Sequence, residues 1–147
     1  MHIHKLLETD KESIEFTIKG SPKALKRHRT SRNGHTYDPS KKDKADFLVK
    51  SLKSAPKLPL NGPIFMSIEF HMARPKSHYR TGKYKHLLKD NAPKHYTKTP
   101  DIDNLEKFVA DALNKVFYID DAMITHVYKS KVYSDNPRTI INLEMVK

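Results

Sequence analysis

With 147 residues the chain has the usual size for one hydrophobic core, so we expect a single domain over residues 1–147. Lys and Arg outnumber Asp and Glu by 28 to 17, and the formal charge of +11 favours an anionic partner, nucleic acid first, with a merely soluble basic protein as the alternative. The absence of cysteine excludes disulfide scaffolds, thiolate zinc sites and cysteine nucleophiles, which fits a reducing, cytoplasmic setting. No apolar run is long enough for a signal peptide or a membrane helix, so no membrane partner is expected.

The first half of the chain predicts two strands with a helix between them. Residues 13–19 alternate apolar and polar side chains, the period of a half-buried strand, whereas residues 1–12 are polar and expected to be frayed. Ser40 is placed to cap a helix that runs to about residue 52. Residues 64–72 then predict an apolar, interior strand. The apolar positions at helical spacing in the helix are Ala45, Leu48, Val49 and Leu52.

Two long segments are strongly basic. Residues 19–42, with a turn at Asn33-Gly34, and the long loop of residues 73–99 each carry eight Lys or Arg against one acidic residue. Such side chains can contact DNA phosphates, and the tyrosines among them can stack on unpaired bases. Solvated, flexible loops are the alternative. The candidate DNA-binding residues are Lys23, Lys26, Arg27, Arg29, Arg32, Tyr37, Arg74, Lys76, Arg80 and Lys83.

The second half predicts a helix over residues 101–115 and then two strands, residues 123–133 and 139–146, joined as a hairpin at Asp135-Asn136-Pro137. The order is β-α-β-loop-α-β-β, so we expect an α+β domain with a mixed β-sheet and helices packed on one face. The apolar arc of the helix comprises Leu105, Phe108, Val109, Ala112 and Val116.

Acidic residues gather around this helix. Six of the 17 lie between Asp101 and Asp121, with Asp103 near the start of the helix and Asp120 beyond its end. Two carboxylates ~4 Å apart repel by about 4 kcal/mol at an effective dielectric near 20, a cost that a divalent cation reverses. Mg²⁺, with one ion or two, would suit these oxygen ligands and promote phosphodiester hydrolysis. Lys107, one turn after Asp103 on the side away from the core, could stabilise charge on phosphate oxygens.

Each of these residues also has a purely structural explanation. Asp103 with Glu106 matches a capping box, Asp101 could favour the positive end of the helix, and the later acidic pair could be a solvated turn. Lys107 and Asp111 could be plain surface residues. None of these explanations accounts for four aspartates around one helix in a basic chain. The nine histidines lack a zinc-binding spacing, so zinc is not expected.

Three motifs in this region resemble the RusA family of Holliday junction resolvases. They are Asp101-Ile-Asp-Asn-Leu-Glu-Lys107, Asp111-Ala-Leu113 and Ile119-Asp-Asp121, which match the family's D-x-D-N-L-x-K, D-A-L and D-D in sequence and in spacing. The basic first loop matches more loosely. The loop of residues 73–99 is longer than in the shortest members, which leaves the choice of substrate open.

The resemblance implies a homodimeric, Mg²⁺-dependent endonuclease, with Mn²⁺ as an alternative ion, that cuts four-way DNA junctions by paired nicks in DNA recombination and repair. It implies metal ligands at Asp101, Asp103 and Asp121, a less defined acidic role for Asp120, and a catalytic lysine at Lys107. Two symmetric cuts also favour a twofold dimer. A broader, phage-type nuclease for branched or flap DNA and a non-enzymatic basic nucleic-acid-binding protein are the competing functions.

Overall fold

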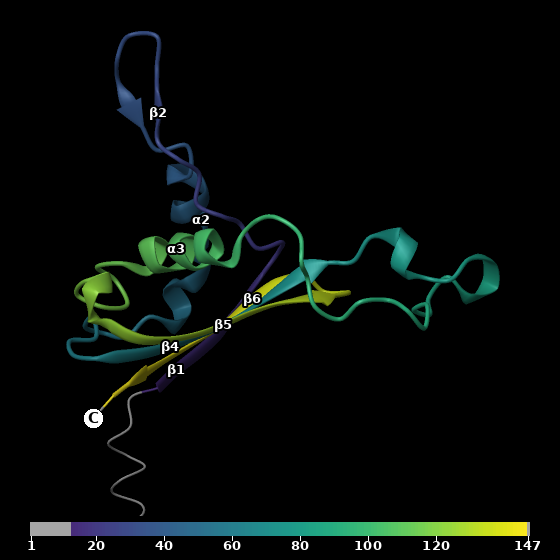
Figure 1. Cartoon of the computed structure of the whole chain (residues 1–147). Helices are drawn as coiled ribbons and strands as arrows, with labels where there is room; N and C mark the ends of the chain where they lie inside the picture. Colours follow the sequence, from purple (N-terminus) through teal and green to yellow (C-terminus); the bar gives the residue numbers. More distant parts are fainter. Residues whose placement is uncertain (1–12, 147) are drawn as a thin grey trace, which may run out of the picture.

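The computed structural model describes residues 13–146, so the expected frayed segment, residues 1–12, lies outside the described residues. Helices α2 (Lys41–Ser51) and α3 (Ile102–Leu113) cover one face of a four-stranded mixed sheet (Figure 1). The sheet order is β1-β6-β4-β5, with β6 antiparallel to β1 and β4, and β4 parallel to β5. This is the expected α+β architecture. The strands are β1 (Ser13–Lys19), β4 (Ile64–Ala73), β5 (Ile124–Ser134) and β6 (Arg138–Met145).

One hydrophobic core lies between the sheet and the two helices. Alternate residues of β4 point into it, and Ile64, Met66 and Ile68 have no exposed surface, as the alternating pattern predicts. The expected apolar arc of α3 is buried from Leu105 to Ala112. Burying a side chain of this size contributes roughly 1.5–3 kcal/mol, so these contacts hold α3 firmly on the sheet.

The expected C-terminal hairpin is wrong in its pairing. Strands β5 and β6 form where expected, but β4 lies between them, and the turn at residues 135–137 carries the chain across the end of β4. The physical reason is that β4 is the most apolar strand. Its residues are best shielded from water when neighbouring strands pair with both of its edges. Helix α3 makes the crossover that a parallel β4–β5 pair requires.

Helix α2 forms as expected, but it buries a different face. Phe47 and Ser51 are buried, whereas Val49 and Leu52 are exposed, because the ring of Phe47 packs edge-on against Phe108 of α3, 5.7 Å between centroids. Ser40 occupies the N-cap position without making the expected side-chain cap. The few apolar residues of this polar helix do not identify its buried face. The contact of Phe47 with Phe108 determines which face is buried.

Two basic segments extend from this body (Figure 1). The short arm, residues 26–38, contains a two-stranded hairpin of β2 (Arg29–Thr30) and β3 (Thr36–Tyr37), with the predicted turn at Gly34, which has φ of +82°. The long arm, residues 74–99, leaves one end of the sheet and carries two single 3-10 turns. Among residues 13–146, no helix has the length and apolar character needed to cross a bilayer.

Candidate nuclease site

The start of α3 holds two of the predicted ligands. Asp101 is the N-cap residue with an extended backbone, and Asp103 lies in the first turn. Asp101 makes no side-chain cap, and Glu106 bonds to Lys129 on β5 rather than to the N-cap backbone. The capping-box explanation of Asp103 is therefore wrong, because the helix begins one residue before Asp103. Both aspartates are exposed, as an external phosphodiester would require.

Lys129 fixes the carboxylate of Asp103. Its ammonium donates to Oδ1 of Asp103 at 2.6 Å and to Oε2 of Glu106 at 2.7 Å. The hydrogen bond from Lys129 lowers the pKa of Asp103 below its ordinary value, with a smaller contribution from Lys107, and the two carboxylates raise the pKa of Lys129. Exposed ion pairs add little stability, so the effect here is to orient an ionised Asp103 at the surface.

A second lysine of β5 holds the chain that enters the motif. Lys131 donates to the backbone oxygens of Lys98 at 2.8 Å and Pro100 at 2.9 Å, immediately before Asp101. Lys129 and Lys131 are opposite buried Ile68 and Phe70 in the sheet register, so both project toward the helix side. Neither lysine was predicted from the sequence. The signal that could have identified them is two cations at alternate, inward-facing positions of one strand.

The other acidic pair lies beyond the far end of α3. Asp120 is 3.5 Å from Lys115, and Asp121 begins a single 3-10 turn. Partial burial raises the pKa of Asp121, followed by the charge of Asp120 and a hydrogen bond with that carboxylate, and Asp111 adds to the effect. The crowding of two carboxyl groups is the kind that an oxygen-ligated cation relieves.

The structure places the two acidic pairs at opposite ends of α3. A 12-residue helix is about 18 Å long. The electrostatic neighbours of Asp103 are Lys129 and Lys107, whereas those of Asp121 are at the C-terminal end of the helix. No group of three or more His, Asp or Glu side chains suited to a metal ion occurs within residues 13–146. One described chain therefore does not assemble the single carboxylate cluster that we expected from the sequence.

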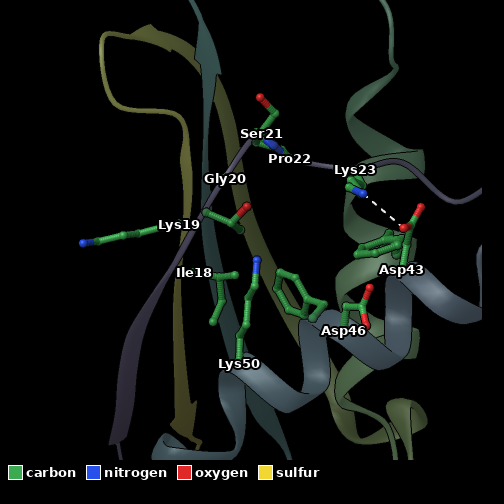
Figure 2. Close-up of a pocket in the computed structure, with 12 residues that line it drawn as sticks. Ile18, Lys19, Gly20, Ser21, Pro22, Lys23, Asp43, Asp46 and Lys50 are labelled. Atoms are coloured by element: carbon green, nitrogen blue, oxygen red, sulfur yellow. Dashed lines mark hydrogen bonds and ion pairs between the residues drawn. The ribbon is translucent and has the colours of Figure 1, made fainter.

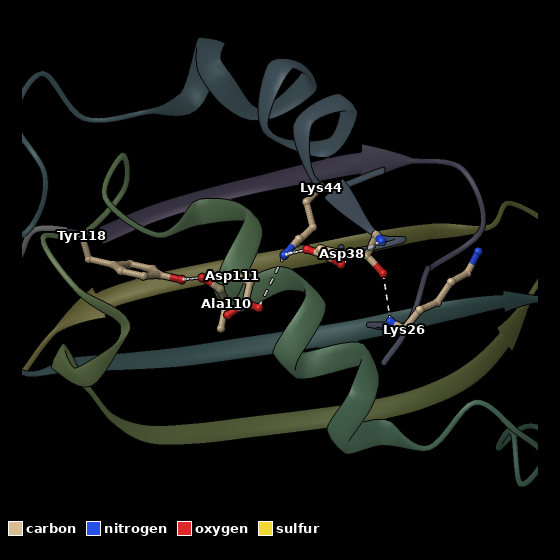
Figure 3. Close-up of polar contacts among 7 residues, drawn as sticks. Lys26, Asp38, Lys44, Ala110, Asp111 and Tyr118 are labelled. Carbon is tan, nitrogen blue, oxygen red and sulfur yellow. Dashed lines mark hydrogen bonds and ion pairs between the residues drawn. The ribbon is translucent and has the colours of Figure 1, made fainter. Parts of the chain in front are cut away.

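The short arm is tied to α3 by a polar network (Figure 3). Nζ of Lys44, on α2, lies 2.5 Å from Oδ2 of Asp38 and 3.7 Å from Oδ2 of Asp111. Oδ1 of Asp38 accepts the N–H of Ser40, and the hydroxyl of Ser40 accepts the N–H of Lys26, both at 2.9 Å. Lys44 lowers the pKa of Asp38 through its hydrogen bond. Asp111, expected to be a surface or supporting residue, therefore helps to anchor the basic arm.

Three of the predicted DNA-binding residues have polar partners within the chain. Lys23 pairs with Asp43 at 3.0 Å, and Arg80 pairs with Asp90 at 3.1 Å. Arg74 donates to the backbone oxygen of residue 93 at 2.8 Å and is half-buried. The structure places the others at exposed or partly exposed positions on the two arms; they are Lys26, Arg27, Arg29, Arg32, Tyr37, Lys76 and Lys83.

A pocket of about 190 Å³ lies between the end of β1 and α2 (Figure 2). Its floor includes Ile18 and Phe47, and the Lys23–Asp43 pair lies at its edge. The predicted site residues Asp101, Asp103 and Asp121 do not line it. Asp101 and Asp103 are exposed at the start of α3, where the long basic arm enters the helix, and an exposed carboxylate-bearing surface suits a polymer rather than a small enclosed ligand.

Exposed carboxylates beside basic arms are features that a protein acting on nucleic acid would need, and the comparison with known families defines the class of protein. Residues 19–144 match the model of the family Endodeoxyribonuclease RusA, so the chain belongs to the RusA endodeoxyribonuclease family. It is similar to Uncharacterized protein YqaN of Bacillus subtilis (strain 168), with 34% identity over 140 residues, which covers 92% of this chain and 98% of the relative.

Proposed function

We propose that this protein is a Mg²⁺-dependent endonuclease that resolves four-way DNA junctions by paired nicks, acting as a homodimer. The supporting observation is the exposed, ionised Asp103, oriented by Lys129 next to Asp101 and Lys107. The long arm leads directly into this site, and the short arm is anchored on the same helix. Both arms are basic, so they can bind the phosphate backbones of the DNA strands that leave a junction.

The motif residues have the chemistry that Mg²⁺ binds. Mg²⁺ binds through one or two carboxylates and completes its shell with water and substrate phosphate oxygens. Asp101 and Asp103 are two exposed carboxylates at the start of α3 that would hold the ion, and the hydrogen bond from Lys129 uses Oδ1 of Asp103. When bound, the ion supplies an activated water and stabilises charge on the leaving oxygen. Lys107 adds positive charge for the phosphate oxygens, and Lys131 holds the backbone before Asp101.

The distance between the two acidic pairs supports a site shared between subunits. The charged neighbours of Asp121 are Asp120, Asp111 and Lys115, whereas those of Asp103 are Lys129 and Lys107, so we infer that Asp121 does not join the Asp103 site within one subunit. In a twofold dimer, the partner's Asp120 and the partner's Asp121 can complete the site, and symmetry then generates two equal sites. Two sites are what paired nicking of a four-way junction needs.

Subunit mixing tests the shared site sharply. Asp103→Asn and Asp121→Asn homodimers should both be inactive. In a mixed dimer of the two variants, a shared arrangement leaves one site with both native aspartates and the other with neither. We expect the mixed dimer to nick one strand of the junction in Mg²⁺. If each site is contained in one chain, both sites of the mixed dimer are damaged, and an inactive mixture would therefore refute the shared site.

A substrate panel tests the main proposal. Four-way, three-way, flap and linear DNA are incubated with the protein, with Mg²⁺ or with EDTA. We expect cleavage of the four-way junction in Mg²⁺ only, loss of cleavage with retained binding in Asp103→Asn, and normal cleavage in Asp46→Asn, a matched exposed aspartate on α2. If no branched substrate is cut, the protein is a non-enzymatic DNA-binding module.

A broader nuclease for branched or flap DNA is the second candidate, and the long arm is the observation that favours it. An ordered basic arm of about 26 residues gives the protein a second surface for DNA beyond the motif helix. Equal cleavage of flap and four-way substrates would support this broader activity over dedicated junction resolution.

A further inference from the structure

The tip of the long arm, residues 80–90, is exposed throughout, yet its backbone forms a defined loop. The backbone N–H of Arg80 donates to the oxygen of Leu87 at 2.8 Å, and that of Lys89 donates to the oxygen of His78 at 2.9 Å. Tyr79 and Leu88 form an antiparallel bridge between these bonds. The loop from residue 80 to residue 88 is thereby closed by its own backbone.

Three large apolar side chains of this loop are exposed to solvent. Tyr84, Leu87 and Leu88 are 48%, 41% and 39% exposed. A single exposed leucine is ordinary on a protein surface, but three large apolar residues within five positions, on an arm that is otherwise polar, indicate a contact site. The ammonium of Lys83 lies 5.1 Å from the centre of the Tyr84 ring, so positive charge and apolar surface alternate at the tip.

The arm is joined to the body through Tyr133 of β5. The ring of Tyr96 contacts it at 5.0 Å between centroids, that of His78 at 4.7 Å, and the guanidinium of Arg74 lies 5.3 Å from its centre. The N–H of Tyr96 donates to the oxygen of Lys131, and the N–H of Tyr133 donates to the oxygen of residue 94. The returning half of the arm is thus hydrogen-bonded to β5 and held in a defined direction.

The charge of the arm identifies the partner. Residues 74–99 carry eight Lys or Arg against Asp90 alone, so the partner is anionic. DNA offers phosphates for these cations and base faces for the apolar tip. An anionic lipid surface has the same two features, but the arm returns directly to Asp101 through backbone oxygens held by Lys131, which favours the substrate of that site.

We propose that Tyr84, Leu87 and Leu88 form a wedge that enters the base stack at the branch point of the DNA while the surrounding cations bind phosphates. This rests on the proposed action on branched DNA. Apolar side chains are inserted between base steps by other DNA-bending proteins, at the cost of unstacking. At a branch point the stack is already interrupted, so the cost is lowest there, and the wedge thereby selects branched DNA over linear duplex.

Fluorescence of 2-aminopurine placed beside the branch point tests the wedge without cleavage. A four-way junction is titrated with protein in EDTA. Wild type should raise the fluorescence severalfold, and the double variant Leu87→Ser with Leu88→Ser should lose most of this rise while it still binds, since the cations remain. Leu58→Ser, an exposed leucine outside both arms, is the matched control and should behave as wild type. A fluorescence rise that is unchanged in the double variant overturns the proposal.

Two further measurements separate the explanations. Sedimentation with phosphatidylserine vesicles should show no dependence on Leu87 and Leu88; dependence there, without any fluorescence change on junctions, would assign the tip to a lipid surface and overturn the wedge. In Mg²⁺, the double variant should cut a fully paired junction roughly tenfold more slowly than wild type, yet cut a junction with mismatched bases at the branch at the wild-type rate. If wild type cuts nothing, the proposed function fails, and the fluorescence result still decides the wedge.

Discussion

Tyr118→Phe removes one partly buried hydrogen bond and little else. The last four carbonyl groups of an α-helix have no partner within the helix, and the oxygen of Ala110 is one of them in α3. The hydroxyl of Tyr118 donates to it at 2.6 Å, and Tyr118 itself has no exposed surface (Figure 3). The Phe variant therefore leaves the partly buried carbonyl of Ala110 without that donor.

The expected loss follows from this geometry. Losing a hydrogen bond typically costs about 0.5–1.5 kcal/mol, and more where the acceptor left behind is buried, so for this partly buried bond we expect Tyr118→Phe to lower the free energy of unfolding by about 1.5 kcal/mol. For a chain of this size that corresponds to a decrease in Tm of about 3–6 °C. Urea and thermal unfolding followed by circular dichroism measure both quantities. Tyr128→Phe is the control, because Tyr128 is 58% exposed, and it should change stability by less than about 0.5 kcal/mol. Equal Tm values for wild type and Tyr118→Phe would refute the reasoning.

Three other predictions concern the site and the arms. Lys129→Met should slow single-turnover cleavage by roughly tenfold with little change in junction affinity, because Asp103 loses the group that orients it; an unchanged rate would remove Lys129 from the site. The pKa of Asp38 is lowered in the folded state by Lys44, so its contribution to stability is complete above its unfolded pKa and is lost as the pH falls through the folded value. The Tm difference between wild type and Asp38→Asn should therefore be full at pH 6 and shrink below about pH 4, and a constant difference would contradict this. Arg32→Ala should reduce the slope of log Kd against log salt by about one, measured by fluorescence anisotropy, and an unchanged slope would show that Arg32 does not contact phosphate.

Periodicity was sufficient for the elements that decide the fold class. The alternation in β1 and β4 and the apolar arc of α3 each identified the buried face, because these segments place apolar side chains on one side only. Periodicity says which face is buried but not which strand pairs with which. The pairing of β5 with β4 rather than with β6 is a long-range choice that leaves no mark on a single segment.

Some features of the candidate site could likewise be predicted from the sequence, and others could not. The motif aspartates were found because their spacing is local to one helix and its flanks. The roles of Lys129 and Lys131 depend on how β5 lies beneath α3, and the separation of Asp103 from Asp121 depends on the length of the helix between them. Both are properties of the assembled fold, so a sequence motif could not supply them.

The place of β6 in the sheet has a consequence for how the protein is made. Strand β6 is hydrogen-bonded to β1 on one side and to β4 on the other, although it is the last of the described strands to leave the ribosome. Until it emerges, β1 has no partner in the sheet and one edge of β4 is open. The chain can therefore complete this sheet only after β6 has been synthesised. A product truncated before β6 would lack the strand that joins β1 to β4, and its apolar β4 would be left with an open edge.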